Sequence, residues 1–176
     1  ALKVQEDSYQ HTGADYDQNK SRAALIMSLR NYCKGLKYFA VSKERRRSPQ
    51  DTPTSSEQTD FRSSVNSSAW GCKHRPDAWA EVHWLQLQFQ QATVSHLVAA
   101  NALTRYLVDT ADRGIEYHAF PAGTRGRLQL WTDGAKGETK SADKPIVGCF
   151  VLLTPDSEET LHGQAHVLDF YGKKSS

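Results

Sequence analysis

The feature that most constrains the fold is a series of short apolar runs, separated by turn-forming residues, in the second part of the chain. In Val82–Phe89 the apolar residues Leu85, Leu87 and Phe89 alternate with glutamines, a period of two that is typical of a half-buried strand. Six further runs have strand character: Val94–Ala99, Arg105–Val108, Ile115–Phe120, Arg127–Trp131, Ile146–Thr154 and His166–Tyr171. Seven short strands with short connections predict a mainly β fold, an antiparallel jelly-roll-like β-sandwich.

A polar segment divides the chain. Residues 42–60 contain no aliphatic or aromatic side chain, so they cannot bury enough surface to offset the entropy of ordering, and we expect a loop or linker. Before it, Lys20–Val41 carries apolar residues at steps of three and four, which predicts an amphipathic helix. The stripe consists of Leu25, Leu29, Tyr32, Leu36 and Phe39. The predicted organisation is therefore a helical segment over 1–41, a linker over 42–60 and a sandwich over 61–176.

The charge and composition of the chain limit the classes of partner that it can bind. Of 176 residues, 38% are apolar, 22 are basic and 20 are acidic. A net charge this small rules out an obvious general polyanion binder but leaves room for a local basic patch. The run Lys43–Arg47 is such a patch; phosphates, heparin-like chains or a processing protease could contact it, although a solvated loop is the simpler interpretation. No specific nucleic-acid partner is expected. No run approaches the roughly 20 apolar residues of a membrane span.

Three cysteines, Cys33, Cys72 and Cys149, are too few for a disulfide-stapled miniprotein or a four-cysteine zinc site. One disulfide with one free thiol, or three buried thiols, both fit this count. Asn19 and Asn66 each begin an N-glycosylation pattern. Two such patterns favour a glycoprotein of the secretory pathway or the cell exterior.

Three segments within 61–176 carry a family resemblance. They are His83–Phe89 followed by Val94–Leu97, then Pro145–Pro155, and finally Val167–Gly172. Together they resemble the discoidin or coagulation-factor C-type domain, a galactose-binding-like β-sandwich. The resemblance implies a jelly roll whose end loops bind a ligand, a carbohydrate-binding or cell-adhesion role, and a structural calcium ion like that of related sandwiches. The cysteines that the family carries at its domain ends are absent here.

Aromatic and basic residues gather between positions 70 and 79, in a stretch with glycine and proline that we expect to be an end loop. Indole rings offer flat faces for stacking, and the cationic side chains offer donors to hydroxyls, carboxylates or phosphates. The alternative is that the two tryptophans plug the end of the sandwich. A second, smaller set lies around Trp131. The candidate ligand-binding residues are Trp70, Lys73, His74, Arg75, Trp79, Arg125, Arg127 and Trp131.

Catalytic signals are sparse. His162 and His166 have a spacing that joins two ligands only on a helix, and the strand-like end of the chain makes them surface histidines instead. Glu81 with His83 or His96 could form an acid–base pair, but no orienting third group is identifiable. No nucleophile elbow, phosphate-binding loop or zinc-protease motif occurs, so we assign no catalytic residue and no metal ligand.

The sequence therefore predicts a non-catalytic recognition module that binds a glycan, a lipid headgroup or a protein through the end loops of a sandwich. One alternative is a hydrolase or lyase on the same scaffold that uses His83, His96 or His118. Another is a structural or assembly subunit such as a capsid-type jelly roll. The identity of the ligand and the oligomeric state stay open.

Overall fold

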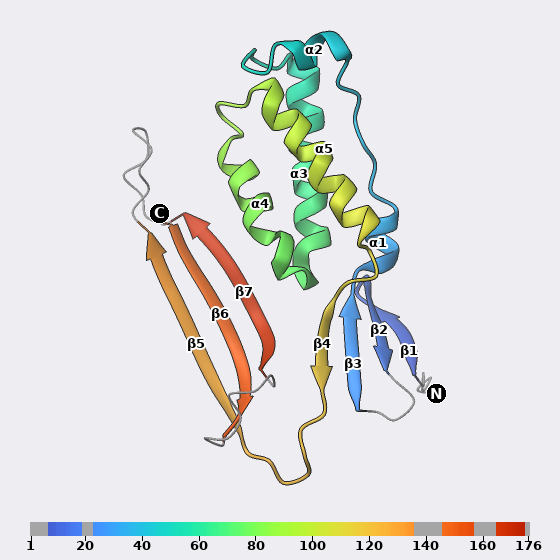
Figure 1. Cartoon of the computed structure of the whole chain (residues 1–176), viewed down its shortest axis with the longest axis vertical. Helices are drawn as coiled ribbons and strands as arrows, with labels where there is room; N and C mark the ends of the chain where they lie inside the picture. The colour runs from blue at the N-terminus through green and yellow to red at the C-terminus, as the bar shows by residue number, and fades with distance from the viewer. Residues whose placement is uncertain (1–6, 19–22, 136–145, 157–164, 175–176) are drawn as a thin grey trace. The chain divides into compact units, whose positions relative to one another are not determined.

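The computed structural model (Figure 1) describes residues 7–18, 23–135, 146–156 and 165–174. The fold is mixed α and β, with two antiparallel sheets. The chain divides into two compact units, one made of residues 1–9, 16–26 and 115–176 and the other of residues 10–15 and 27–114. We call the second one the helical unit.

The helices of the helical unit begin at recognisable signals. They are α1 (Arg30–Lys34), α2 (Lys43–Arg47), α3 (Ser55–Gly71), the 3₁₀ turn η1 (Cys72–His74), α4 (Pro76–Leu87) and α5 (Val94–Asp109). Helix α3 starts with a reciprocal capping box in which the Thr54 hydroxyl accepts from the Glu57 amide and the Glu57 carboxylate accepts from the Thr54 amide. Helix α4 has proline in its first turn, where the missing N–H costs nothing.

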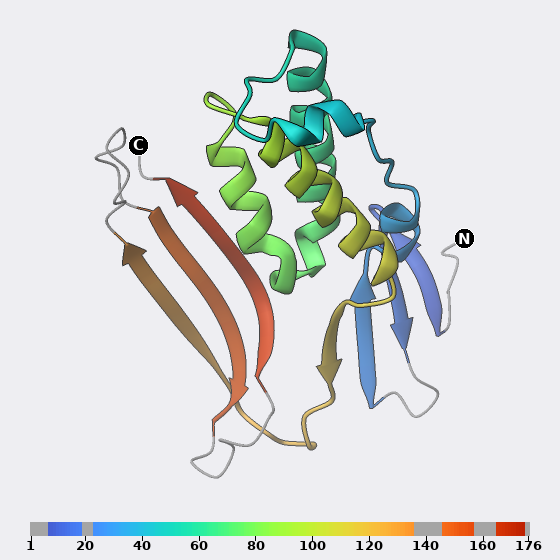
Figure 2. The ribbon, with the colours of Figure 1, turned by 45° about the horizontal axis from the view of Figure 1, so that its top comes forward.

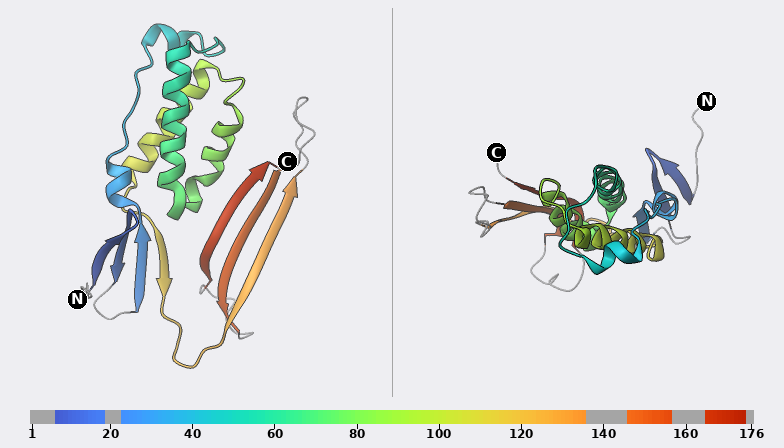
Figure 3. Two further views of the ribbon diagram at one scale, coloured as in Figure 1. Left: turned by 180° about the vertical axis from the view of Figure 1, so that it is seen from behind. Right: turned by 90° about the horizontal axis from the view of Figure 1, so that it is seen from above.

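Helices α3, α4 and α5 pack together as a bundle (Figures 2 and 3). Figure 2 shows the helices with the top of the molecule tilted forward, and Figure 3 shows them from behind and from above. The core is built from Phe61 and Val65 of α3, Val82 and Leu85 of α4, and Val94, Leu97 and Leu107 of α5. Burial of these side chains contributes about 1.5–3 kcal/mol each, so the bundle supplies the rigid frame for the loops beside it.

One sheet has the strand order β1-β2-β3-β4. Its strands are β1 (Ser8–His11), β2 (Ala14–Gln18), β3 (Ala24–Ser28) and β4 (Ile115–His118). The rings of Tyr9 and Tyr16 stack across β1 and β2 with centroids 4.8 Å apart. Strands β3 and β4 are neighbours in this sheet and run in opposite directions (Figure 1), although the helices separate them in sequence. Just beyond the two strands, the Ala119 amide donates to the Ala23 carbonyl over 2.7 Å.

The other sheet is an antiparallel meander with the order β5-β6-β7. Its strands are β5 (Gly126–Ala135), β6 (Ile146–Pro155) and β7 (His166–Lys174). A register irregularity lies between Val151 and Leu152 on the β6–β7 side. The Tyr117 hydroxyl of β4 donates to the Val167 carbonyl over 2.8 Å, and the ring of His166 packs against Tyr117 and Phe120. These contacts tie β4 to β7 within the same unit.

The fold corrects the prediction of a mainly β sandwich. Four of the predicted strands are confirmed as β4, β5, β6 and β7, but Val82–Phe89 lies largely in α4, while Val94–Ala99 and Arg105–Val108 are parts of α5. The alternation in the first run extends over only three apolar residues. The buried positions Ala78, Val82 and Leu85 follow steps of four and three, a helical period that the longer window shows.

The N-terminal prediction also differs from the structure. Instead of one helix over Lys20–Val41, the described part of this range holds β3 and the short α1, which ends at Lys34 with Gly35 as its C-cap. The segment 42–60, which the sequence predicts as a linker, contains α2 and the start of α3. Its residues are ordered through polar contacts and caps, so the lack of apolar side chains does not prevent helix formation there. No helix of the described residues is long and apolar enough to cross a membrane.

Candidate functional site

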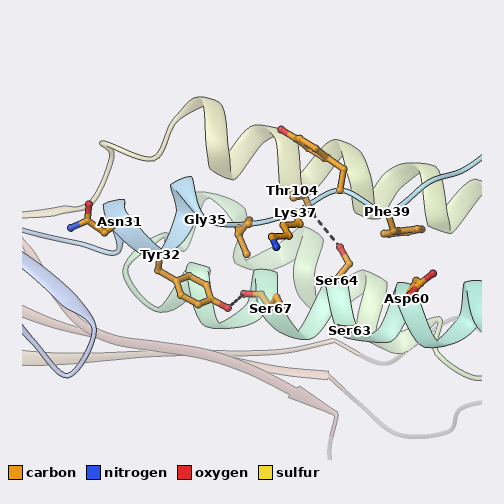
Figure 4. A pocket seen from close by; sticks show the side chains of 12 residues that line it. Asn31, Tyr32, Gly35, Lys37, Phe39, Asp60, Ser63, Ser64, Ser67 and Thr104 are labelled. Atoms are coloured by element: carbon orange, nitrogen blue, oxygen red, sulfur yellow. Dashed lines mark hydrogen bonds between the residues drawn. The ribbon is translucent and has the colours of Figure 1, made fainter.

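A groove of about 590 Å³ lies in the helical unit, between the segment 31–39 and the serine-bearing side of α3 (Figure 4). Helix α5 adds Thr104. The groove is lined by Asn31, Tyr32, Gly35, Leu36, Lys37, Tyr38, Phe39, Asp60, Ser63, Ser64, Ser67 and Thr104. This volume is within the usual range for small-molecule sites.

The α3 side of the groove presents hydroxyl groups. Ser67 lies about one helical turn from both Ser63 and Ser64, so the three serines lie on the same side of the helix. The Thr104 hydroxyl donates to the Ala100 carbonyl over 3.0 Å, and it therefore accepts from Ser64, whose oxygen is 3.2 Å away. Figure 4 shows this contact and the one that links Tyr32 to Ser67. The arrangement offers both donors and acceptors to a polar ligand.

The opposite side carries a lysine and aromatic rings. Tyr38 is 51% exposed and Lys37 is exposed, so both can meet a ligand in the groove. The neighbouring Phe39 is held at its main chain by Asn101, which accepts from the Phe39 amide over 3.2 Å and donates to its carbonyl over 2.9 Å. The Tyr32 hydroxyl donates to the Ser67 carbonyl over 3.1 Å. The wall is thus fixed at both ends by side-chain contacts to the bundle.

A smaller cavity of about 190 Å³ also lies in the helical unit. Its lining includes Arg46 and Arg105, together with Asn101, and the Arg46 Nε donates to the Val41 carbonyl over 3.0 Å. Asn101 also bonds the main chain of Phe39, which lines the large groove, so this contact links the linings of the two cavities. Two guanidinium groups beside one cavity favour an anion there.

Positive charge concentrates along this side of the unit. Positions 30–47 hold seven basic residues and one acidic residue. Part of that charge is neutralised locally, since Lys34 pairs with Asp112 over 3.3 Å and Arg45 pairs with Glu57 over 2.9 Å. Lys37, Lys43 and Arg47 have exposed side chains. The groove itself carries one cation, Lys37, and one carboxylate, Asp60, so the excess of positive charge lies at α2 and the smaller cavity, which is lined by Arg46 and Arg105.

Arg45 and Glu57 form the anchor of this basic segment. The guanidinium donates twice to the carboxylate, over 3.0 and 2.9 Å, and once to the Thr52 carbonyl over 3.0 Å. The hydrogen bonds from Arg45, followed by the one from the Thr54 amide, lower the pKa of Glu57 to about 2. The anchor holds α2 against the start of α3, so the exposed cations of α2 stay next to the smaller cavity.

The cluster predicted between Trp70 and Trp79 is helical rather than a loop. Its residues occupy the end of α3, the turn η1 and the first turn of α4. Lys73 lies over the ring of Trp70, with its nitrogen 3.5 Å from the centroid, so these two predicted residues are together on the surface. His74 and Trp79 are half-buried. Burial, and then the charge of Lys73, lower the pKa of His74.

Arg75 is a structural residue. Its side chain is 1% exposed. The guanidinium donates to both oxygens of Asp77 over 2.9 and 2.8 Å, and to the carbonyl and hydroxyl of Thr110 over 2.9 and 2.8 Å. These contacts join the start of α4 to the end of α5, and they leave the guanidinium no face toward a ligand.

The second predicted set lies on β5 and beside it. Arg127 forms an ion pair with Asp156, while Trp131 is 63% exposed and its indole N–H donates to Gln129 over 3.3 Å. Arg125 is exposed just before the strand. These residues belong to a different unit from Trp70.

The three histidines of the alternative hydrolase, His83, His96 and His118, lie on three different elements. His96 caps α5 by accepting from the Thr93 amide over 3.0 Å, His83 lies on α4, and His118 of β4 is 3.7 Å from Glu116. His162 lies outside the described residues. The prediction of a surface histidine is wrong for His166, which is buried. Within the described ranges, no three histidine, cysteine, aspartate or glutamate side chains are grouped so that they could hold a metal ion. The structural calcium ion stays a prediction.

The cysteine alternatives resolve to three buried free thiols. Burial raises the pKa of Cys33, and it raises the pKa of Cys72 to about 12, so both stay protonated at neutral pH. Of the two glycosylation patterns, Asn66 is an exposed residue of α3, and Asn19 lies outside the described residues.

Comparisons with protein-family models, with curated proteins and with solved structures give no match. The resemblance to the discoidin family therefore stays a prediction, and the site has to be interpreted from its own chemistry. Sequence reasoning missed the groove residues. The available signal was the spacing of Asp60, Ser63, Ser64 and Ser67, which places polar side chains on one face if this segment is a helix.

Proposed function

We propose that the helical unit is a recognition module that binds a nucleic-acid strand along the groove and the smaller, basic cavity. The observation that carries the proposal is the combination of exposed Tyr38 and Lys37 with a hydroxyl-bearing helix face, inside a segment with seven basic residues and one acidic residue. Proteins that bind single strands combine a positive groove that follows the backbone with aromatic rings on which bases stack.

Each part of the groove has a matching part in a nucleotide chain. Tyr38 offers a ring face to a base, and Lys37 beside it offers a cation to the adjoining phosphate. The hydroxyls of α3 can bond sugar hydroxyls or base edges. Arg46 and Arg105 at the smaller cavity supply a second phosphate position, so the ligand is a polymer rather than a single anion.

This chemistry favours a nucleic acid over the ligands predicted from sequence. A neutral glycan would use the rings and hydroxyls but gain nothing from the surrounding cations, and a lipid headgroup would use the cations but not a series of rings. Binding of a protein ligand stays a prediction, because the groove and the smaller cavity offer no feature that favours a protein. Placement in the secretory pathway rests on the glycosylation patterns alone and carries no weight in this proposal.

The test is fluorescence anisotropy with labelled single-stranded RNA, single-stranded DNA and a duplex, at several salt concentrations. We expect binding that weakens as the salt concentration rises. Lysine and arginine side chains of the protein release counterions from the phosphates, and this release is less favourable at high salt. Tyr38→Ala should weaken binding about 5-fold or more, because stacking contributes roughly 1–3 kcal/mol per base. Lys37→Ala should weaken binding and also reduce the salt slope by about one.

Lys73→Ala is the matched control, because Lys73 is an exposed lysine of the same unit that contacts Trp70 outside the groove. It removes one charge and should leave the affinity nearly unchanged. Heparin in competition separates the remaining possibilities. If heparin binds as tightly as RNA and Tyr38→Ala has no effect, the surface is a plain cation patch; if no strand binds at low salt, the proposal is wrong.

A further inference from the structure

Strand β5 forms an outer edge of the three-stranded sheet. Among the residues that the structure describes, it is hydrogen-bonded to β6 alone. Its side chains are unusually exposed for an apolar strand, with Leu128 and Leu130 each 67% and Trp131 63% exposed. A long apolar edge of this kind is a template for another strand unless something covers it.

The direction of the backbone groups of β5 can be worked out from its pairing with β6. The Asp156 amide donates to the Arg125 carbonyl over 2.7 Å, so Arg125 points its main-chain groups toward β6. The next residue, Gly126, faces Pro155, which has no N–H and fits a position without a ladder bond. Odd-numbered residues therefore bond β6, and the N–H and C=O groups of Leu128, Leu130 and Thr132 point outward.

The outward groups suit a two-fold pairing of β5 with itself. If two copies meet antiparallel about Leu130, each Leu128 faces the Thr132 of the other copy, and about six main-chain hydrogen bonds form. The same register places Arg127 opposite Asp133 at both ends of the pair. Arg127 and Asp133 bond β6 within their own sheet, so in the pairing between the two copies they form a non-hydrogen-bonded pair. Facing side chains approach most closely at such pairs. Moving the centre by two residues in either direction separates the opposite charges.

We propose that the outer edge of β5 is a homodimer interface in which a second copy of this chain adds its own β5 antiparallel, centred on Leu130. The partner is a second copy because the charges of the edge complement themselves: Arg127 near one end, Asp133 near the other. Arg127 already contacts Asp156 of its own chain. Its guanidinium has five N–H donors, so it can serve this carboxylate and the Asp133 of the second copy together.

The test is the oligomeric state of the full chain, measured by sedimentation equilibrium over a concentration series. We expect a dimer. Asp133→Arg places two arginines opposite each other at both ends and should raise the dimer dissociation constant at least 10-fold. The double variant Arg127→Asp with Asp133→Arg exchanges the charges and should restore part of the lost affinity, a rescue that only a pairing between these two positions predicts.

Arg125→Asp is the matched control, because the proposed register puts Arg125 opposite Ala135, so the same change of charge should leave the dimer intact. Leu130→Pro removes an outward N–H without touching the ladder to β6, and it should also give a monomer. Circular dichroism verifies that each variant folds. A parent chain that stays monomeric at every concentration would overturn the proposal, and so would a dimer that is indifferent to both Asp133→Arg and Leu130→Pro.

Discussion

Replacing Arg75 with lysine tests whether this residue stabilises the fold or binds a ligand. The guanidinium makes four hydrogen bonds, two to Asp77 and two to Thr110, all between 2.8 and 2.9 Å. A lysine ammonium keeps a charge for Asp77, but it cannot reproduce the planar fork. We therefore count the two contacts to Thr110 as lost. At about 1–1.5 kcal/mol for each lost hydrogen bond, Arg75→Lys should destabilise the helical unit by about 2–3 kcal/mol.

The measurement is thermal and urea unfolding followed by circular dichroism at 222 nm. For a unit the size of a small domain, about 2–3 kcal/mol corresponds to a fall in Tm of roughly 10–20 °C. Arg47→Lys is the control, because Arg47 is an exposed residue at the end of α2, and it should change the free energy of unfolding by less than about 0.5 kcal/mol. An Arg75→Lys variant as stable as the parent would refute the reasoning and return Arg75 to the candidate ligand-binding residues.

Three further predictions concern stability and can be checked with the same unfolding assay. Glu57→Gln removes a carboxylate whose pKa is held at about 2, so we expect a loss of about 1–2 kcal/mol at pH 7 that disappears as the pH falls from about 4.5 toward 2, where the parent carboxylate also becomes neutral. Burial lowers the pKa of His83, so the unfolded chain binds a proton that the folded chain does not; stability should fall as the pH drops below about 6.5, and His83→Gln should reduce that fall. A Cβ at Gly114 would lie 2.2 Å from the Met27 carbonyl oxygen, so Gly114→Ala should cost about 2 kcal/mol or more, whereas Gly148→Ala, with open space around it, should cost far less.

The C-terminal strands were the part of the fold that the sequence predicts well. Ile146–Pro155 is apolar over nearly its whole length, and turn-forming residues flank it. A run of that length and composition has few alternatives to a strand in the middle of a sheet. The edge strand β5 is predicted from a different signal, because its leucines alternate with polar residues.

The bundle was harder to predict because its helices carry weak signals. Helix α3 buries only two large apolar side chains, Phe61 and Val65, so its period is hidden among serines and polar residues. Helix α5 has buried residues over four turns, yet short windows such as Val94–Ala99 look like strands because valine is β-branched. The sequence does contain one signal for the start of α3, the pair Thr54 and Glu57, which matches a capping box, but the prediction of a linker over 42–60 does not use it.

The candidate groove depends on contacts that no local pattern contains. Asn101 holds the main chain of Phe39 from a position 62 residues away, and Thr104 meets Ser64 across two helices. Arg75 illustrates the opposite error, since a cationic residue between tryptophans looks like a ligand contact until its partner Thr110, 35 residues later, is known. Such pairings follow from tertiary packing, which overrides local sequence pattern.

In the sequence, the helices lie between β3 and β4, two strands that are neighbours in one sheet. Gly114 packs against Met27, and β3 and β4 are neighbours in their sheet, so residues 27–114 leave and return at almost the same point. A segment with adjoining ends resembles a cassette: its length or content can change without forcing the two flanking strands apart. We expect insertions or wholesale replacements within this cassette to be tolerated far better than a single residue added to β3 or β4, which would shift their pairing and turn every following side chain to the other face.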